Sequence, residues 1–215
     1  MNVAVHRVAI DDPRWASDAT ELSPEERARA SRLVYERDRS RFVAAHKALR
    51  RILTRAIGGE PSIDVGAEGK PFVRGSDVRF NLSHAGDVAL VAVSSDCDVG
   101  VDVERVRAVE ATAIAERMFS VAERAALARA ADTERAFFRG WTRKEAFVKL
   151  VGAGLGMDLC AFDVSLDPHP ERALIAVRTG STRATIVPLA IDEGYEAALA
   201  AAADSVHIAR FDERP

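Results

Sequence analysis

Two carboxylates one residue apart stand in residues 99–105, where apolar and polar side chains alternate. In a β-strand this alternation directs Asp102 and Glu104 to the same face. Neighbouring carboxylates repel each other unless water or a base such as Arg105 compensates them. A divalent cation that prefers oxygen ligands, such as Mg²⁺, can hold both in the ionised form. The pattern makes Asp102 and Glu104 candidate metal ligands, although a D-x-E sequence alone is a weak signal.

A second group lies in residues 141–149, Trp-Thr-Arg-Lys-Glu-Ala-Phe-Val-Lys. Glu145 and Lys149 are four residues apart, so they lie one above the other on a helix. Most such pairs are surface ion pairs without further consequence. Here the apolar neighbours predict a buried helix, in which an acid and an amine without a function would be costly. The composition of this segment therefore favours a functional site.

Residues suited to phosphate form a third group. Gly69-Lys70-Pro71 predicts a turn that presents one ammonium, and Phe80-Asn81-Leu82-Ser83-His84 predicts a strand that ends in a hydroxyl and an imidazole. Each of these groups can donate a hydrogen bond to a phosphate oxygen. Taken singly, they are equally compatible with an ordinary turn and a structural histidine.

Lysine is rare in this chain. Of the 30 basic residues only Lys47, Lys70, Lys144 and Lys149 are lysines, and the other 26 are arginines. A compact ammonium on a flexible stem is not equivalent to a planar guanidinium. Because Lys70, Lys144 and Lys149 fall in the segments described above, we interpret them as functional. We expect Lys47 to be a surface helix residue.

The elements that must position these residues can be predicted from caps and periodicity. Ser23 and Glu26, like Ser120 and Glu123, have capping-box spacing. It predicts one or two helices between residue 24 and about residue 56, and another from residue 121 to 131. A longer helix capped by Thr133 is expected to reach about residue 151. Strands are predicted at 3–10, 63–65, 72–73, 78–82, 88–94 and 99–104, and at intervals in 162–211.

A faint repeat relates residues 85–93 to residues 193–201, with a Gly-to-Asp spacing of ten residues in both copies. On this basis residues 196–203 are predicted to form a strand, although their intrinsic propensity is helical. The fold class is therefore α+β: two similar halves in tandem, residues 1–100 and 101–215, each with helices packed on an antiparallel sheet. We expect the active site to lie between the halves.

Composition narrows the classes of function. The net charge is −3 and the pI is about 6.0, which argues against a nucleic-acid-binding surface. No apolar stretch approaches the length of a membrane span. Cys97 and Cys160 lack the spacing of a zinc site, and the N-terminus lacks a basic and then apolar leader, so a cytoplasmic protein is expected.

The motifs, taken together and in order, resemble those of the 4′-phosphopantetheinyl transferase superfamily, Sfp-type (surfactin-synthetase-activating type). They are Gly-Lys-Pro at 69–71, F-N-x-S-H at 80–84, G-x-D-x-E at 100–104 and W-x-x-K-E-x-x-x-K at 141–149. The resemblance covers most of residues 23–156. It implies a pseudo-twofold monomer that binds coenzyme A between its halves and, with Mg²⁺, transfers phosphopantetheine to a serine of an acyl or peptidyl carrier protein. Adenosine 3′,5′-bisphosphate would be the second product.

The resemblance also implies a role for each matched residue. The metal ligands would be Asp102, Glu104 and Glu145, and the catalytic residues would be Glu145, as the base, and Lys149. The residues that bind the coenzyme would be Arg37, Lys70, Ser83, His84, Lys144 and Lys149. One departure is Glu26, which stands among the first-helix arginines where the family often has lysine, so the contact to the 3′-phosphate is left open.

Two other classes of function compete with this interpretation. A Mg²⁺-dependent nuclease or phosphohydrolase could use an acidic strand and a Glu-x-x-x-Lys helix, but the net charge of −3 disfavours a nucleic-acid groove. A non-catalytic carrier-binding or nucleotide-binding module could keep the same fold. The joint presence of Asp102, Glu104, Glu145, Lys144 and Lys149 argues against a loss of chemistry.

Overall fold

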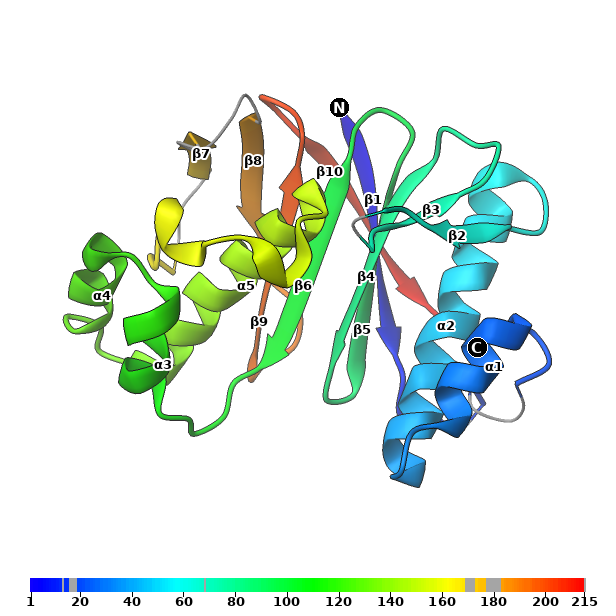
Figure 1. The fold of residues 1–215 in the computed structure, drawn as a ribbon, viewed down its shortest axis with the longest axis horizontal. Coiled ribbons are helices and arrows are strands. Elements are labelled where there is room, and N and C mark those ends of the chain that lie inside the picture. The colour runs from blue at the N-terminus through cyan, green and yellow to red at the C-terminus, as the bar shows by residue number, and fades with distance from the viewer. Residues whose placement is uncertain (13, 16–18, 68, 169–172, 177–182, 215) are drawn as a thin grey trace.

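The computed structural model describes residues 1–215 except 13, 16–18, 68, 169–172, 177–182 and 215 (Figure 1). The described helices are α1 (Pro24–Ser31), α2 (Glu36–Ile57), α3 (Ala111–Met118), α4 (Val121–Leu127) and α5 (Thr133–Val151). The described strands are β1 (Asn2–Ala9), β2 (Ile63–Val65), β3 (Pro71–Val73), β4 (Arg79–Ala85), β5 (Val88–Ser94), β6 (Val99–Arg105), β7 (Ala173–Ala176), β8 (Arg183–Pro188), β9 (Tyr195–Ala201) and β10 (His207–Glu213). The α+β class predicted from the sequence is confirmed.

The strands form two four-stranded sheets and a small hairpin. The first sheet has the order β10-β1-β5-β4, the second has the order β6-β9-β8-β7, and β2 pairs with β3. All pairs are antiparallel except β1 with β10, which run parallel. The C-terminal strand therefore joins the first sheet, so this part of the expected second half, residues 101–215, packs with the first. The expected boundary at residue 100 also falls inside β6.

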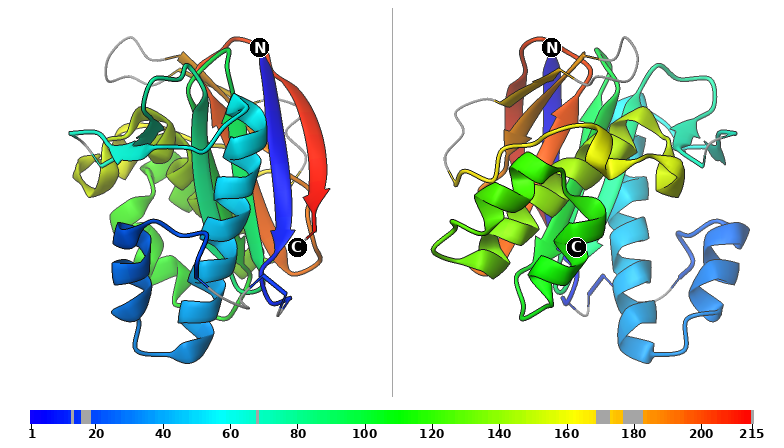
Figure 2. Two further views of the ribbon diagram at one scale, coloured as in Figure 1. Left: turned by 90° about the vertical axis from the view of Figure 1, so that its right-hand side faces the viewer. Right: turned by 60° about the vertical axis from the view of Figure 1, so that its left-hand side comes forward.

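The two sheets pack face to face, and a helix covers the outer face of each (Figures 1 and 2). Alternation along β5 shows this directly: Val88, Leu90 and Ala92 belong to the core between the sheets, whereas Ala89 and Val91 belong to the core beneath α2. A strand that is covered on both faces is apolar throughout rather than alternating. The second sheet packs in the same way against α5.

Both predicted capping boxes are present. The side chain of Ser23 accepts a hydrogen bond from the Glu26 backbone at the start of α1, and Ser120 and Glu123 do the same at α4. The N-cap of α5 is Asp132 rather than the expected Thr133, because the Asp132 carboxylate accepts the Arg135 backbone N–H at 2.9 Å. No helix among the described residues is both long and apolar enough to cross a membrane.

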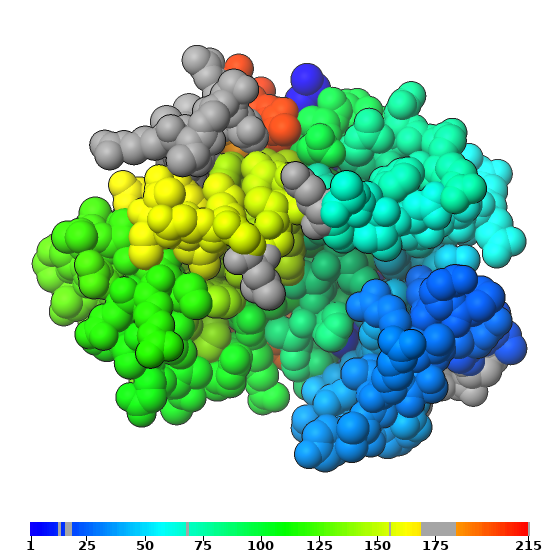
Figure 3. Space-filling view, in the orientation of Figure 1, coloured from blue at the N-terminus to red at the C-terminus, as the bar shows by residue number. Residues whose placement is uncertain are grey.

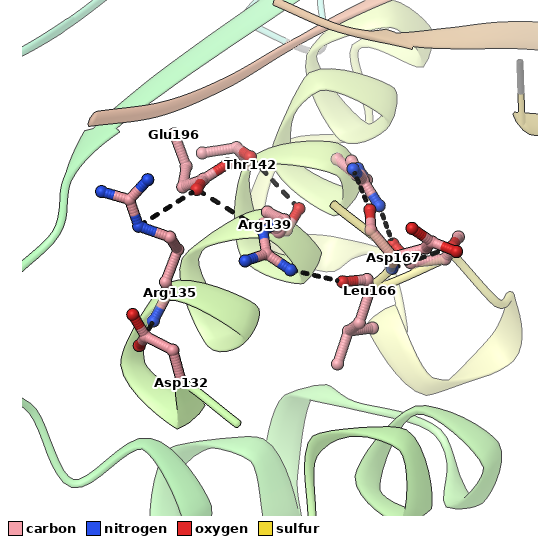
Figure 4. Close-up of polar contacts among 9 residues, drawn as sticks. Asp132, Arg135, Arg139, Thr142, Leu166, Asp167 and Glu196 are labelled. Atoms are coloured by element: carbon pink, nitrogen blue, oxygen red, sulfur yellow. Dashed lines mark hydrogen bonds and ion pairs between the residues drawn. The ribbon is translucent and has the colours of Figure 1, made fainter. Parts of the chain in front are cut away.

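Helix α5 is fixed by arginines along one of its sides (Figure 4). Arg139 Nε lies 3.4 Å from Glu196 Oε1 on β9, and its Nη1 donates to the Leu166 carbonyl at 2.9 Å. The guanidinium of Arg143, which is buried, donates to the carbonyls of Ser165 and Asp167. These contacts tie α5 to β9 and to the chain that follows the helix, and so fix which residues face β6.

The strand predicted against helix propensity is confirmed. Residues 195–201 form β9, and Ala197 to Ala201 are buried. Alternate residues of β9 pack against the first sheet and against α5, so burial on two sides overrides the preference of an alanine-rich segment for a helix.

Candidate active site

The acidic residues of β6 face α5, as the alternation of the strand predicts. Val99, Val101 and Val103 lie in the core between the sheets, which leaves Asp102 and Glu104 on the side of the helix. Asp102 is buried at 4% exposure, and Glu104 is half-buried.

Gly100 permits a close approach of α5 to this strand. A Cβ atom at position 100 would lie 2.1 Å from the Ala146 carbonyl oxygen and 2.4 Å from the Leu150 nitrogen, and both of these are backbone atoms. Only glycine allows the helix to pack so closely on β6. The glycine therefore brings the turn that holds Glu145 and Lys149 against Asp102.

Asp102, Ser83 and Lys149 form a hydrogen-bonded group that joins three elements. Lys149 Nζ lies 2.6 Å from Asp102 Oδ1 and 2.9 Å from Ser83 Oγ, and Ser83 Oγ donates to Asp102 Oδ1 at 2.8 Å. The other oxygen, Asp102 Oδ2, is buried and has no hydrogen-bond partner within the described residues. A buried carboxylate oxygen without a partner is costly unless a ligand satisfies it.

The pKa values of all three carboxylates predicted as metal ligands are raised. Burial raises the pKa of Asp102, and the Lys149 ammonium opposes this shift. Burial and the charge of Asp102 both raise the pKa of Glu104. The same causes, with a further contribution from Glu104, raise the pKa of Glu145. In the described part of the chain, no three His, Cys, Asp or Glu side chains are arranged closely enough to form a metal site as they stand.

Side chains of β4, rather than its backbone, join the first sheet to the second. The Val101 N–H donates to Asn81 Oδ1 at 2.9 Å, and the Val103 N–H donates to Ser83 Oγ at 3.4 Å. From the first of these hydrogen bonds to the second, the residue number rises by two in β4 and by two in β6. The two strands therefore run in the same direction. Sequence reasoning missed Asn81; the available signal was its position two residues before Ser83, on the same face of the strand.

A cavity of about 1070 Å³ opens beside β4, between α1, α2 and the β2–β3 hairpin. Its lining includes Asn81, His84, His46, Arg29 and Arg50. In Figure 3, the blue segment of α1 and α2 and the cyan segment that holds the β2–β3 hairpin border this region. Sequence reasoning missed His46 and Arg50, which belong to a helix that carries many charged residues and offers no motif to distinguish them.

Both histidines of this cavity are held towards the neutral form. The His84 residue is exposed, yet partial desolvation, together with the charges of Lys149 and Arg41, lowers its pKa. Burial lowers the pKa of His46 to about 4, although its Nδ1 lies 2.9 Å from the Phe42 carbonyl oxygen. A neutral imidazole can donate one hydrogen bond and accept another.

The structure brings Lys70 to the boundary of the two sheets. Its ammonium donates to the Leu150 carbonyl at 2.7 Å, in the last turn of α5, and to Asp98 Oδ1 at 3.3 Å. Arg37 lies on the exposed first turn of α2, where its Nε is 3.5 Å from Asp38 Oδ1. Neither residue contacts the Asp102 group in this conformation of the described chain.

Two lysines are placed differently from the sequence-based expectation. Lys144, expected to bind the coenzyme, is fully buried; its Nζ lies 2.8 Å from Glu123 Oε2 and donates to the carbonyls of Leu159 and Phe162 at 2.6 and 2.8 Å. It lies on the side of α5 away from the Asp102 group because one helical position separates it from Glu145 by about 100°. Lys47, expected on the surface, is 2% exposed, with Nζ 3.5 Å from Glu21.

Comparison with known proteins gives consistent matches. Residues 98–200 match the family model described as the 4′-phosphopantetheinyl transferase superfamily. The chain is 33% identical to the 4′-phosphopantetheinyl transferase HetI of Nostoc sp. (strain PCC 7120), over 93% of this chain and 87% of that protein. It is 32% identical to the 4′-phosphopantetheinyl transferase psf-1 of Bacillus pumilus, over 95% and 93%. It is 29% identical to a 4′-phosphopantetheinyl transferase of Bacillus subtilis, over 97% and 98%.

The three relatives match over 93–97% of this chain, and the residues that match the family model include strand β6 and helix α5, which meet at Asp102. The resemblance predicted from the motifs is thereby confirmed, and the chain belongs to the 4′-phosphopantetheinyl transferase superfamily.

Proposed function

We propose that this enzyme transfers the 4′-phosphopantetheine group of coenzyme A to a serine hydroxyl of an acyl or peptidyl carrier protein, in a reaction that requires Mg²⁺. The observation that carries the proposal is the Asp102 carboxylate, which is buried at the boundary of the two sheets. Lys149 and Ser83 hold one of its oxygens, and the other has no hydrogen-bond partner among the residues that the structure describes. Membership of the superfamily supplies the class of group that is moved.

The reaction is a displacement at phosphorus. The serine oxygen forms a bond to the phosphorus that bears the pantetheine ester, and the bond from that phosphorus to the bridging oxygen of the pyrophosphate breaks. The leaving group is adenosine 3′,5′-bisphosphate, and the serine proton passes to a base. Catalysis of such a transfer depends mainly on positioning and on neutralising the charge of the phosphoryl oxygens.

The acidic residues fit a Mg²⁺ ion by their chemistry. Asp102, Glu104 and Glu145 offer carboxylate oxygens, the charge of Asp102 raises the pKa of both glutamates, and Asp102 Oδ2, which has no partner among the described residues, is available to a cation. When bound, the ion would neutralise negative charge on the pyrophosphate oxygens. We propose these three residues as its ligands.

Glu145 is the proposed base. It is half-buried, and burial together with the charges of Asp102 and Glu104 makes it more basic than an ordinary glutamate. A base of raised pKa is better matched to the proton of a hydroxyl near neutral pH. The residue lies one helical turn from Lys149, so base and ammonium act on the same reacting group.

We propose that charged and neutral hydrogen-bond donors at the boundary of the two sheets bind the coenzyme. Lys149 and Ser83 contact Asp102, His84 follows Ser83 on β4, and all three can donate to the pyrophosphate. Lys70 can turn from Asp98 towards the coenzyme, and Arg37 is free to approach from the exposed start of α2. Arg29 and Arg50 in the cavity offer further charge for the remaining phosphate, although Glu26 lies 3.6 Å from Arg50 and competes for it.

We further propose that the chain is built from two halves related by a pseudo-twofold axis and acts as a monomer. The order β1-β5-β4, covered by α2, is matched by β6-β9-β8, covered by α5. Turn glycines with positive φ, Gly86 and Gly194, precede β5 and β9. Because β4 from one half and β6 with α5 from the other supply the site, one chain is sufficient.

The mass of an apo-carrier protein tests the function. Incubation with this enzyme, coenzyme A and Mg²⁺ should add one phosphopantetheine group to the carrier and release an equal amount of adenosine 3′,5′-bisphosphate. A carrier whose acceptor serine is replaced by alanine should gain no mass. The Mg²⁺-dependent nuclease is not favoured by the comparisons, and it would instead release nucleotides from DNA or RNA while the carrier stays unmodified.

A further inference from the structure

Asn81 occupies an unusual place between two sheets. It is 7% exposed, belongs to the last strand of the first sheet, and accepts the backbone N–H of Val101 in the first strand of the second sheet at 2.9 Å. No backbone ladder joins β4 to β6 in the described structure. The amide oxygen of Asn81 thus stands where a neighbouring strand would ordinarily offer a carbonyl oxygen.

This hydrogen bond fixes the residue immediately before Asp102. Val103, the residue after Asp102, donates its N–H to Ser83. Side chains of β4 therefore hold the backbone on both sides of Asp102. Ser83 also contacts the carboxylate itself, and the ammonium of Lys149 contacts both. A shift of β6 relative to β4 would therefore change the distances within the Asp102, Ser83 and Lys149 group.

We propose that Asn81 is a positioning residue for the transfer reaction: by holding the Val101 N–H it sets the register and spacing of β6 against β4, and thereby the arrangement of Asp102, Ser83 and Lys149. The inference rests on the proposed function. Without the amide oxygen, the buried Val101 N–H has no acceptor and the strand must move to regain one, because a buried unpaired donor is costly.

Two variants and a matched control test this role. Asn81→Leu keeps the approximate size but removes the acceptor, whereas Asn81→Asp keeps an acceptor oxygen. The control is Ser94→Ala in β5: Ser94 is 4% exposed and its Oγ donates to the Asn2 carbonyl at 2.7 Å, so it is another buried β-strand side chain that hydrogen-bonds a neighbouring backbone. For each enzyme we would measure kcat, the KM for coenzyme A, the melting temperature and the hydrogen exchange of the Val101 amide.

We expect Asn81→Leu to lower kcat by about 10- to 100-fold, the effect of a small displacement of reacting groups, while the KM for coenzyme A changes by less than about threefold. Its Val101 amide should exchange faster than that of the wild type. Asn81→Asp should retain more activity than Asn81→Leu. Ser94→Ala should lose thermal stability while its kcat and its Val101 exchange stay close to those of the wild type.

The inference is overturned if Asn81→Leu, compared at equal fraction folded, keeps the kcat of Ser94→Ala, or if its Val101 amide stays as protected as in the wild type. A wild-type enzyme that modifies no carrier would instead refute the proposed function. In that case the exchange of the Val101 amide alone decides whether Asn81 holds β6.

Discussion

At the scale of single residues, we expect the chemistry to depend on a lysine that holds a buried carboxylate. The Lys149 ammonium lies 2.6 Å from Asp102 Oδ1 and 2.9 Å from Ser83 Oγ. Three elements meet at that point, and the ammonium carries the only positive charge that the described contacts place on Asp102. A single small charge centre with three donors suits this confined position.

Replacement of Lys149 should therefore be damaging even when the charge is kept. We expect Lys149→Met to lower kcat by about 10²- to 10³-fold, the usual cost of removing one charge-stabilising donor. Lys149→Arg should lose at least about tenfold, because the planar fork cannot occupy the point between Asp102 and Ser83. Steady-state kinetics check this, with Arg124→Lys on the exposed face of α4 as the control. A Lys149→Arg enzyme with the wild-type rate would show that the rarity of lysine in this chain has no functional meaning.

At the scale of helices and strands, the buried side chain of Lys144 ties α5 to its neighbours. Its ammonium joins α5 to Glu123 of α4 and to the carbonyls of Leu159 and Phe162, and burial lowers its pKa. It thus fixes the rotation of the helix that carries Glu145 and Lys149 without contacting them.

The prediction for Lys144 is a loss of stability rather than of chemistry. Lys144→Met leaves Glu123 buried without its cation and should lower the unfolding free energy by about 3–5 kcal/mol. Combining it with Glu123→Leu should recover part of this loss, since no buried charge is then unpaired. Denaturant unfolding measures the stability, and kcat is compared at a temperature where each variant is folded. A Lys144→Met enzyme that is as stable as the wild type but has a raised KM for coenzyme A would contradict this account and indicate that Lys144 binds the coenzyme.

Packing of α5 on β6 gives a second prediction at this scale. A methyl group at position 100 would overlap backbone atoms of Ala146 and Leu150, which cannot turn aside. We expect Gly100→Ala to displace the helix, to lower the unfolding free energy by about 1–3 kcal/mol and to reduce kcat, because Lys149 moves with the helix. Gly59→Ala is the control, since nothing lies within 4 Å of the added atom there. Equal activity of the two variants would contradict the account of Gly100.

Local patterns predicted the elements well. The alternation in residues 99–105 predicted which side of the strand Asp102 and Glu104 occupy, and the two capping boxes predicted where α1 and α4 begin. These predictions were possible because each signal lies within a few consecutive residues. The contacts of Lys144, Lys47 and Asn81 were not predicted. Each depends on a partner far along the chain, such as Glu123, Glu21 or Val101, and no local spacing encodes that partner.

At the scale of the whole molecule, the fold brings β4, the last strand of the first sheet, next to β6, the first strand of the second sheet. The candidate site lies where these two strands meet. The C-terminal strand β10 returns to pair with β1, which ties the end of the chain to its beginning. The hydroxyl of Tyr195, in the second sheet, accepts the Asp87 N–H of the β4–β5 turn at 3.1 Å. These contacts hold the two sheets in place relative to each other.

The unfolding free energy of the folded chain should fall at mildly acidic pH. His46 has a pKa of about 4 in the folded chain, against 6.5 in an unfolded one, so between these values the unfolded state binds more protons. Its contribution is fully present above pH 6.5 and is lost as the pH falls, by about 2 kcal/mol at pH 5. His46→Asn, which does not titrate, should remove this part of the dependence.

Denaturant unfolding at pH 7.5 and pH 5 measures the effect as the difference between wild type and variant. The same change with pH in both proteins would show that His46 does not carry it.

A structure of the enzyme with coenzyme A and Mg²⁺ tests the central claim most directly. We predict one ion bound by oxygens of Asp102, Glu104 and Glu145 at about 2.1 Å, with the pyrophosphate within hydrogen-bond reach of Lys149 and His84. The Asn81–Val101 hydrogen bond should be retained in that complex. A coenzyme whose pyrophosphate lies away from β4 and β6, or an ion held without Asp102, would contradict the account.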